Sequence, residues 1–351
     1  MSSNQENSAS NNPHIAGAIT FPSRSDENMQ PIPVQPRQPR NLQGLLRFAM
    51  EATKAEDAPG NSQFTPLDEE RRKFLEEALK SLTVNVAQVL MDAIKVLTDQ
   101  EKLNNIKPGE KLPDDVTLAF GNLLECIDDI DIANDFYKMG GFAIFPICYG
   151  CENDEVRANA SWVLAELCQN NPFCQARALE CGLLNVLLNL AQTEQATALA
   201  KCIYAISCAC REYQQSCDEL VSQGGCETLS QLLSAPAQSR TKAAFFIRYL
   251  CQHHPQAREK FIQENLVRTV TQQIQSGHDE TTEHLLGILS ILLEDNDSRV
   301  LDQCRDPFLG LKKLLEDTSS YEDERECCQE LLKRIFEGCP EYDAVDEVAD
   351  R

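Results

Sequence analysis

The chain has 351 residues, of which 42% are hydrophobic and 6% aromatic, and its formal net charge is −23. The apolar content suffices for a large core, whereas so acidic a chain is unsuited to nucleic acid or anionic membranes, whose binding depends on Lys and Arg. No run of about 18 apolar residues occurs and residues 1–10 lack a signal-peptide pattern, so we expect the protein in the cytoplasm, or also in the nucleus, with its 16 cysteines as free thiols. We also expect a monomer.

The N-terminal part of the sequence divides into a polar segment and a helical region. Residues 1–40 carry only scattered apolar side chains, too few to offset the entropy of ordering, and are predicted to be disordered. Residues 41–115 form the predicted N-terminal helical region, which ends in a loop over 104–115. Apolar residues recur there at helical spacing, and the predicted helices cover 41–54, a segment that begins near 68, and 86–97.

Two sets of residues recur at an almost constant spacing farther along the chain. Gly and Asn tolerate the left-handed conformation that ends a helix, and one set has steps of 42, 42 and 41 residues: Gly140, Gly182, Gly224 and Asn265. The other set closes apolar runs, with steps of 42, 41 and 42 residues: Cys168, Cys210, Cys251 and Leu293. Two markers in the same register indicate a true repeat.

Each period contains a short apolar helix after the break and then a longer helix. The predicted long helices cover 156–168, 196–210, 241–251 and 280–293. Periods of about 40–47 residues with two or three helices are typical of HEAT and armadillo solenoids. We therefore predict an all-α protein, a right-handed superhelical armadillo-repeat solenoid. Its predicted parts are about four units of 41–42 residues over 116–307, capping helices over 308–340 and an acidic tail over 341–351.

The sequence contains few signs of catalysis. A Gly-rich phosphate loop and the GxSxG and HExxH motifs are all missing. Cys148 and Cys151 have CxxC spacing, but no second pair of ligands lies near them, so we interpret both as core thiols. His253 and His254 precede Pro255 at a helix end, where capping of the helix C-terminus is the favoured role. We therefore predict no enzymatic activity, no cofactor and no metal.

Stacked helical units form a concave surface that can bind another protein, and the long helices line it. Aligning these helices places Trp162, Tyr204, Phe245 and Gly287 in one column. Residues one turn before and after share its face, and aromatic and basic side chains together are typical of binding hot spots. The alternative is that the rings only pack between repeats and that the acidic surface only aids solubility. The candidate partner-binding residues are Asn159, Trp162, Glu166, Lys201, Tyr204, Arg211, Lys242, Phe245, Arg248, Tyr249 and His284.

An ordered set of segments resembles the heat-shock-protein-70-binding protein 1 family, the armadillo-type nucleotide exchange factors of heat-shock protein 70. The first two are NLQGLLRFAM at 41–50 and DEERRKFL at 68–75. The others, in chain order, are ANDF at 133–136, GG at 140–141, YAISC at 204–208 followed by Arg211 and Glu212, EHLLG at 283–287, CRDP at 304–307 and LGLKKLL at 309–315. The resemblance spans residues 41 to 336.

The resemblance implies a cytosolic co-chaperone that embraces one lobe of the heat-shock protein 70 ATPase domain. It would separate the lobes so that ADP leaves and the client is released, and residues 1–40 would occupy the chaperone's peptide groove. Two other binding functions stay open. One is an armadillo adaptor that holds an extended peptide of another protein, and the other is an inhibitor of a chaperone-linked ubiquitin ligase.

Overall fold

A computed structural model describes residues 85–337 and the single residue 73. The chain divides into two compact units, Met1–Thr83 and Val84–Arg351, and the helices below belong to the second. Within 85–337 every regular element is a helix, and none has the length and apolar character needed to cross a bilayer. The predicted polar segment, the helices expected at 41–54 and from residue 68, and the acidic tail lie outside the described residues.

Three helices precede the repeats: α3 (Val86–Leu97), α4 (Gln100–Asn104) and α5 (Asp114–Cys126). The helix predicted over 86–97 coincides with α3, and the predicted loop corresponds to the connection between α4 and α5. Side chains fix where the first two begin, because Asn85 accepts a hydrogen bond from the amide of Gln88 and Asp99 accepts one from that of Lys102. Helix α3 packs against α5, which in turn reaches α8 in the first repeat.

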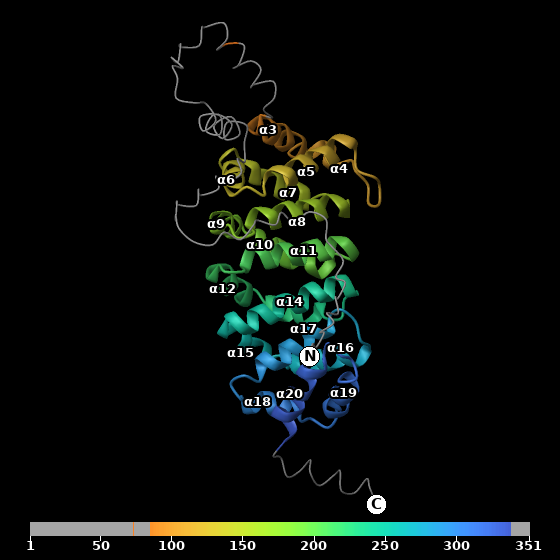
Figure 1. Cartoon of the computed structure of the whole chain (residues 1–351). Coiled ribbons are helices and arrows are strands. Elements are labelled where there is room, and N and C mark those ends of the chain that lie inside the picture. Colours follow the sequence, from red (N-terminus) through yellow and green to blue (C-terminus); the bar gives the residue numbers. More distant parts are fainter. Residues whose placement is uncertain (1–72, 74–84, 338–351) are drawn as a thin grey trace, which may run out of the picture. The chain divides into compact units, whose positions relative to one another are not determined.

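From Ile130 onward, the described chain repeats a group of three helices five times (Figure 1). The first helices are α6 (Ile130–Lys138), α9 (Pro172–Glu180), α12 (Gln214–Ser222), α15 (Pro255–Gln263) and α18 (Ser298–Cys304). The second helices are α7 (Ile144–Tyr149, after the 3-10 turn η1, Gly141–Ala143), α10 (Leu183–Thr193), α13 (Gly225–Leu232), α16 (Leu266–Ser276) and α19 (Leu311–Thr318). The third helices are α8 (Asp154–Cys168), α11 (Ala196–Cys210), α14 (Ala237–His253), α17 (Thr282–Leu292) and α20 (Arg325–Phe336).

The junction between the first and second helix of each group depends on a left-handed residue. Gly140, Gly182, Gly224 and Asn265 have φ values of 84°, 68°, 76° and 57°, as predicted for helix breaks. Gly310 has a φ of 60° and makes a fifth break before α19, 45 residues after Asn265. The helices after the fourth break therefore continue the same three-helix order, and the domain boundaries given above stay predictions.

The third helices form a row in which each contacts the next: α8 packs on α11, α11 on α14, α14 on α17 and α17 on α20 (Figure 1). Large apolar side chains fill the space behind this row, and Phe136, Phe145, Phe246 and Phe261 are fully buried. Each helix group thus buries its apolar stripe against its neighbours, which is how a solenoid is stabilised. The arrangement agrees with the predicted all-α armadillo fold.

Ion pairs of the same kind join the groups at two places. Arg157, in the first turn of α8, pairs with Glu194 in the turn before α11 and donates to the carbonyl of Cys151 at 2.7 Å. Arg240, at the same position in α14, pairs with Asp279 in the turn before α17. In both cases an arginine of one third helix holds the connection that leads into the next.

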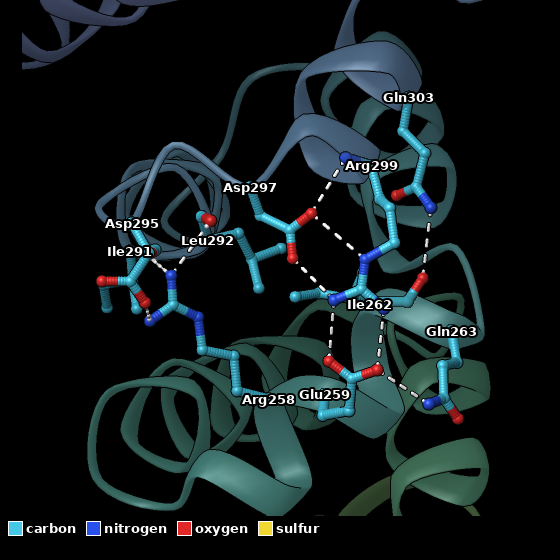
Figure 2. Close-up of polar contacts among 10 residues, drawn as sticks. All are labelled: Arg258, Glu259, Ile262, Gln263, Ile291, Leu292, Asp295, Asp297, Arg299 and Gln303. Atoms are coloured by element: carbon cyan, nitrogen blue, oxygen red, sulfur yellow. Dashed lines mark hydrogen bonds and ion pairs between the residues drawn. The ribbon is translucent and has the colours of Figure 1, made fainter.

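A second polar junction links α15, α17 and α18 (Figure 2). The Arg258 side chain donates from Nη2 to the carbonyls of Ile291 and Leu292, at 2.9 and 3.1 Å, and so caps the end of α17. Arg299 of α18 forms two 2.8 Å hydrogen bonds to the Glu259 carboxylate of α15, and it also reaches Asp297 at 2.6 Å.

The residues weighed for metal or redox chemistry have structural roles here. Cys148 and Cys151 are buried, burial raises the pKa of the Cys148 thiol to about 12, and Cys151 Sγ lies 3.1 Å from the carbonyl oxygen of Leu103. No group of three or more His, Cys, Asp or Glu that could hold a metal occurs within 85–337. The helix end predicted at the histidines is found there: His254 is the C-terminal cap residue of α14, and its amide donates to the carbonyl of Leu250 at 2.9 Å. The side chain has a further role that was not predicted, because His254 Nδ1 accepts from the amide of Ala257 and so caps the start of α15.

Candidate functional site

The predicted partner-binding residues lie on one face of the row of third helices, which we call the third-helix face. It carries Trp162 on α8, Tyr204 on α11 and Phe245 on α14, one ring per helix at equivalent positions. The fourth helix, α17, has Gly287 at that position. The structure therefore places the predicted column on consecutive helices, and the side chains around it show what the face can bind.

Each ring on this face contacts a nitrogen-containing side chain of the next helix. Lys201 Nζ lies 3.2 Å from the centroid of the Trp162 ring, and Lys242 Nζ lies 5.1 Å from that of Tyr204. The His284 ring meets Phe245 edge-on, with 5.8 Å between the ring centroids. Cation–π attraction holds the two lysines in place without neutralising their charge. Two rings of the face thus have a lysine ammonium of the next helix over them, and the third meets an imidazole edge-on.

Glu166 organises the hydrogen bonds at the α8 end of the face. Its Oε1 accepts from Trp162 Nε1 at 2.8 Å and from the Tyr204 hydroxyl at 3.3 Å. The same hydroxyl lies 3.1 Å from Oε1 of Gln169, which follows the end of α8. Burial raises the pKa of Tyr204, and the negative charge of Glu166 raises it further, so the hydroxyl stays protonated and able to donate. Sequence reasoning missed Gln169 because it lies outside the helical column.

Arg211, just after α11, covers two rings of α14. Its guanidinium carbon lies 5.5 Å from the Phe245 centroid and 5.6 Å from that of Tyr249. The Tyr249 hydroxyl accepts a 2.7 Å hydrogen bond from the amide of Glu212, a residue with a left-handed φ of 60°. This backbone contact was not predicted, because the sequence does not show where the turn after α11 runs.

The interruption of the ring column at Gly287 has a steric reason. A Cβ atom there would lie 2.8 Å from Nε of Arg248, so the glycine leaves room for that side chain against α17. Arg248 also pairs with Glu283 at 3.8 Å. At the other end of the face, Asn159 is half-buried one turn before Trp162. The ring column therefore ends at Gly287, where the Arg248 side chain takes the space. The structure brings together the central candidates Trp162, Lys201, Tyr204, Lys242, Phe245 and His284.

A hollow of about 250 Å³ lies between α11 and α14 on this face. Its lining residues are Ile203, Tyr204, Ser207, Arg211, Thr241, Lys242, Phe245 and His284. Phe245 leaves 42% of its surface exposed, which is unusual for a ring that only packs between repeats. Ile203, Ser207 and Thr241 were not predicted, because they lie beside the columns and not in them.

Unpaired positive charge distinguishes the face electrostatically. Burial lowers the pKa of the Lys201 ammonium, and the positive charge of Lys242 lowers it further. Among the residues of the described part, neither lysine nor Arg211 has a carboxylate within ion-pair distance. Aromatic surface combined with unpaired cations can bind an acidic or polar surface of another protein.

Comparisons with known proteins identify related sequences over most of the chain. Residues 132–242 match the SIL1/FES1/HPBP1 C-terminal domain, and residues 42–136 match Nucleotide exchange factor Fes1. Hsp70-binding protein 1 of Mus musculus is 28% identical over 334 residues, which cover 89% of this chain and 90% of the mouse protein. The human protein of the same name is 28% identical, over 88% and 89% of the two chains. Hsp70 nucleotide exchange factor FES1 of Coccidioides immitis is 33% identical over 29% of this chain and 49% of its own.

Solved structures with the same fold are armadillo proteins. A designed armadillo repeat protein in complex with the peptide (KR)4 superposes with a TM-score of 0.56 at 16% identity, covering 69% of this chain and 99% of the designed one. Computationally designed armadillo repeat proteins for modular peptide recognition give a TM-score of 0.56 at 15% identity, with the same coverage. At such low identity the likeness establishes the fold alone, and it confirms the predicted armadillo class.

Proposed function

Because this chain belongs to the SIL1/FES1/HPBP1 family, we propose that it is a nucleotide exchange factor and co-chaperone of a cytosolic heat-shock protein 70. In this function the monomeric chain binds the chaperone's ATPase domain through the third-helix face, and the bound domain opens and releases ADP and then the client. The chain acts by binding and performs no covalent chemistry. Its proposed location is the cytoplasm, because the proposed partner is a cytosolic chaperone.

One observation carries this function: the match to Hsp70-binding protein 1 extends over about nine tenths of both chains. The two family models also overlap over residues 132–136, so that together they cover residues 42–242 and reach into the third repeat. A shared fold alone would not suffice, because armadillo proteins bind many partners. The ordered sequence match supports heat-shock protein 70 as the partner, and the rings and cations support the third-helix face as the binding surface.

The energetics of exchange set a requirement for this face. The chain must shift the nucleotide cleft of the chaperone from mostly closed to mostly open. A shift in the ratio of open to closed from 1:99 to 99:1 requires that the chain bind the open form more tightly by about 5.5 kcal/mol. A standard interface buries about 1,600 Å², and four third helices at about 8–10 Å spacing offer a surface of this scale. Linkage requires that ADP weaken binding of the chain by the same factor by which the chain weakens binding of ADP.

The direct test is the release of a fluorescent ADP analogue from purified heat-shock protein 70, with and without the full chain. We expect accelerated release that saturates with the amount of chain added. The double variant Lys201→Glu and Lys242→Glu should lose this acceleration and keep its helical circular dichroism. Unchanged release at saturating wild-type chain would refute the exchange function. Binding of extended peptides by the face without any chaperone binding would favour the adaptor instead.

A further inference from the structure

We propose, on the basis of the function proposed above, that the α11–α14 hollow receives an aspartate or glutamate side chain of the partner, held between Lys242 and Arg211. This assigns a specific chemistry, recognition of a single carboxylate, to one position on the third-helix face. Three properties of the hollow lead to it: the placement of its cations, the lack of acidic partners for them, and its size.

The cations of the hollow are positioned in advance. Lys242 is held over the ring of Tyr204, and Arg211 over the ring of Phe245. Both line the hollow, so its two cationic walls come from neighbouring units of the repeat. Rings restrict where these long side chains lie but leave their N–H groups available for an acceptor. Such preorganisation reduces the entropy lost when a carboxylate binds.

Arg211 can offer guanidinium donors to an acceptor in the hollow, because it is one of the lining residues. Its contacts are with the Phe245 and Tyr249 rings, which leave terminal N–H groups of the guanidinium available. A carboxylate is the acceptor that a guanidinium binds best.

The lack of acidic partners for Lys242 and Arg211 is unexpected for a chain of net charge −23. Several arginines elsewhere in the repeats are paired, for example Arg157 with Glu194 and Arg299 with Glu259. The nearby Glu166 is instead engaged with Trp162 and Tyr204. The positive charge of Lys242 lowers the pKa of Lys201, and the charge of Glu166 offsets this only in part, so an incoming anion would relieve the repulsion between the two lysines.

The size of the hollow limits what can occupy it. Pockets for drug-sized ligands measure about 300–1,000 Å³, and this hollow of about 250 Å³ falls below that range. It suits one side chain of a docked protein. Ile203 and Phe245 give it apolar walls beside the cations, which match the methylene groups and the carboxylate of an acidic side chain. A polyanion such as nucleic acid is disfavoured by the acidic remainder of the molecule.

The test compares Lys242→Gln with Lys138→Gln, a control that removes the same charge from an exposed lysine at the end of α6. Binding to full-length heat-shock protein 70 is measured by isothermal titration at low and high salt. We expect about a tenfold loss of affinity for Lys242→Gln, a weaker salt dependence than wild type, and no change for the control. Equal affinities of the two variants would overturn the carboxylate assignment alone. A wild-type chain that fails to bind would overturn the proposed function, and the assignment with it.

Carbodiimide cross-linking identifies the chemistry directly, because it joins an amine to a carboxylate with loss of water. In the wild-type complex we expect an amide between Lys242 and an Asp or Glu of the chaperone's ATPase domain, located by mass spectrometry. Lys242→Arg keeps the positive charge but has no primary amine, so it should lose this cross-link. A complex in which Lys242 forms no cross-link to the chaperone would contradict the assignment.

Discussion

The ion pair between Arg157 and Glu194 provides a sharp test of how the repeats are held together. The exposed fractions of the two side chains are 18% and 5%, so the carboxylate is almost completely removed from water. Arg157→Ala would leave Glu194 buried without its cation and Cys151 without the hydrogen bond to its carbonyl. Breaking one side of a buried pair costs about 3–5 kcal/mol, because an uncompensated charge stays inside.

This magnitude can be measured by chemical and thermal unfolding of the full chain, followed by circular dichroism. For a domain of this size, 3–5 kcal/mol corresponds to a fall in Tm of roughly 6–20 °C. Repeat arrays can unfold in more than one step, so the denaturant slope must be compared between variants along with the midpoint. An unchanged slope with a lower midpoint assigns the loss to the native contact.

Two further variants make the test decisive. Replacing both members of the pair, Arg157→Met with Glu194→Met, removes the charges together and should recover most of the lost stability. Lys138→Ala breaks the exposed pair with Asp135 and should cost less than about 1 kcal/mol. The reasoning is refuted if Arg157→Ala costs no more than Lys138→Ala, or if the double replacement is as destabilising as the single one.

Three smaller predictions address the helix junctions and the acidic network. Gly182→Ala should lose about 1–2 kcal/mol of unfolding free energy through its left-handed backbone alone, since a Cβ there meets no atom within 4 Å. Gly121 is equally open but lies within α5, so Gly121→Ala should gain up to about 1 kcal/mol. Equal effects of the two substitutions would contradict the assigned conformations. His254→Ala should lose more than about 1 kcal/mol, the contribution of the missing α15 cap, because it also removes a buried ring whose Nε2 lies 3.0 Å from Asp218 Oδ1. His254→Asn should lose less, because an Asn side chain can restore the cap. Hydrogen bonds from Arg299 lower the pKa of Glu259 from 4.5 to about 2, so this carboxylate stabilises the fold above pH 4.5 and the contribution disappears as pH falls toward 2. Arg299→Met should therefore reduce the loss of stability across that interval in acid titrations, and identical titration curves would exclude the contact.

The repeat could be predicted because its breaks require particular residues. Gly140, Gly182, Gly224 and Asn265 occupy left-handed positions that few other residues tolerate, so the backbone requirement is visible in the sequence. Gly310 meets the same requirement, but its irregular spacing concealed it. A local conformational constraint can thus be recognised wherever its period is constant, and is missed where a loop changes length.

The candidate site was predictable as a face but not as a set of contacts. Helical periodicity placed Trp162 and Lys201 in neighbouring columns, but whether they touch depends on the offset between α8 and α11, which no local pattern encodes. The ion pair between Arg157 of α8 and Glu194, which lies in the turn before α11, depends on the same offset and could not be predicted either. Gln169 contributes from a turn, where helical spacing no longer applies.

The central claim is that the third-helix face binds the chaperone, and hydroxyl-radical footprinting tests it most directly. Phe245, on that face, is 42% exposed, and Phe308, in the loop before α19, is 95% exposed and serves as the internal reference. With heat-shock protein 70 at saturation, we predict that oxidation of Phe245 and Trp162 slows severalfold while that of Phe308 is unchanged. Equal oxidation rates of Phe245 in the free and the fully bound chain would contradict the claim.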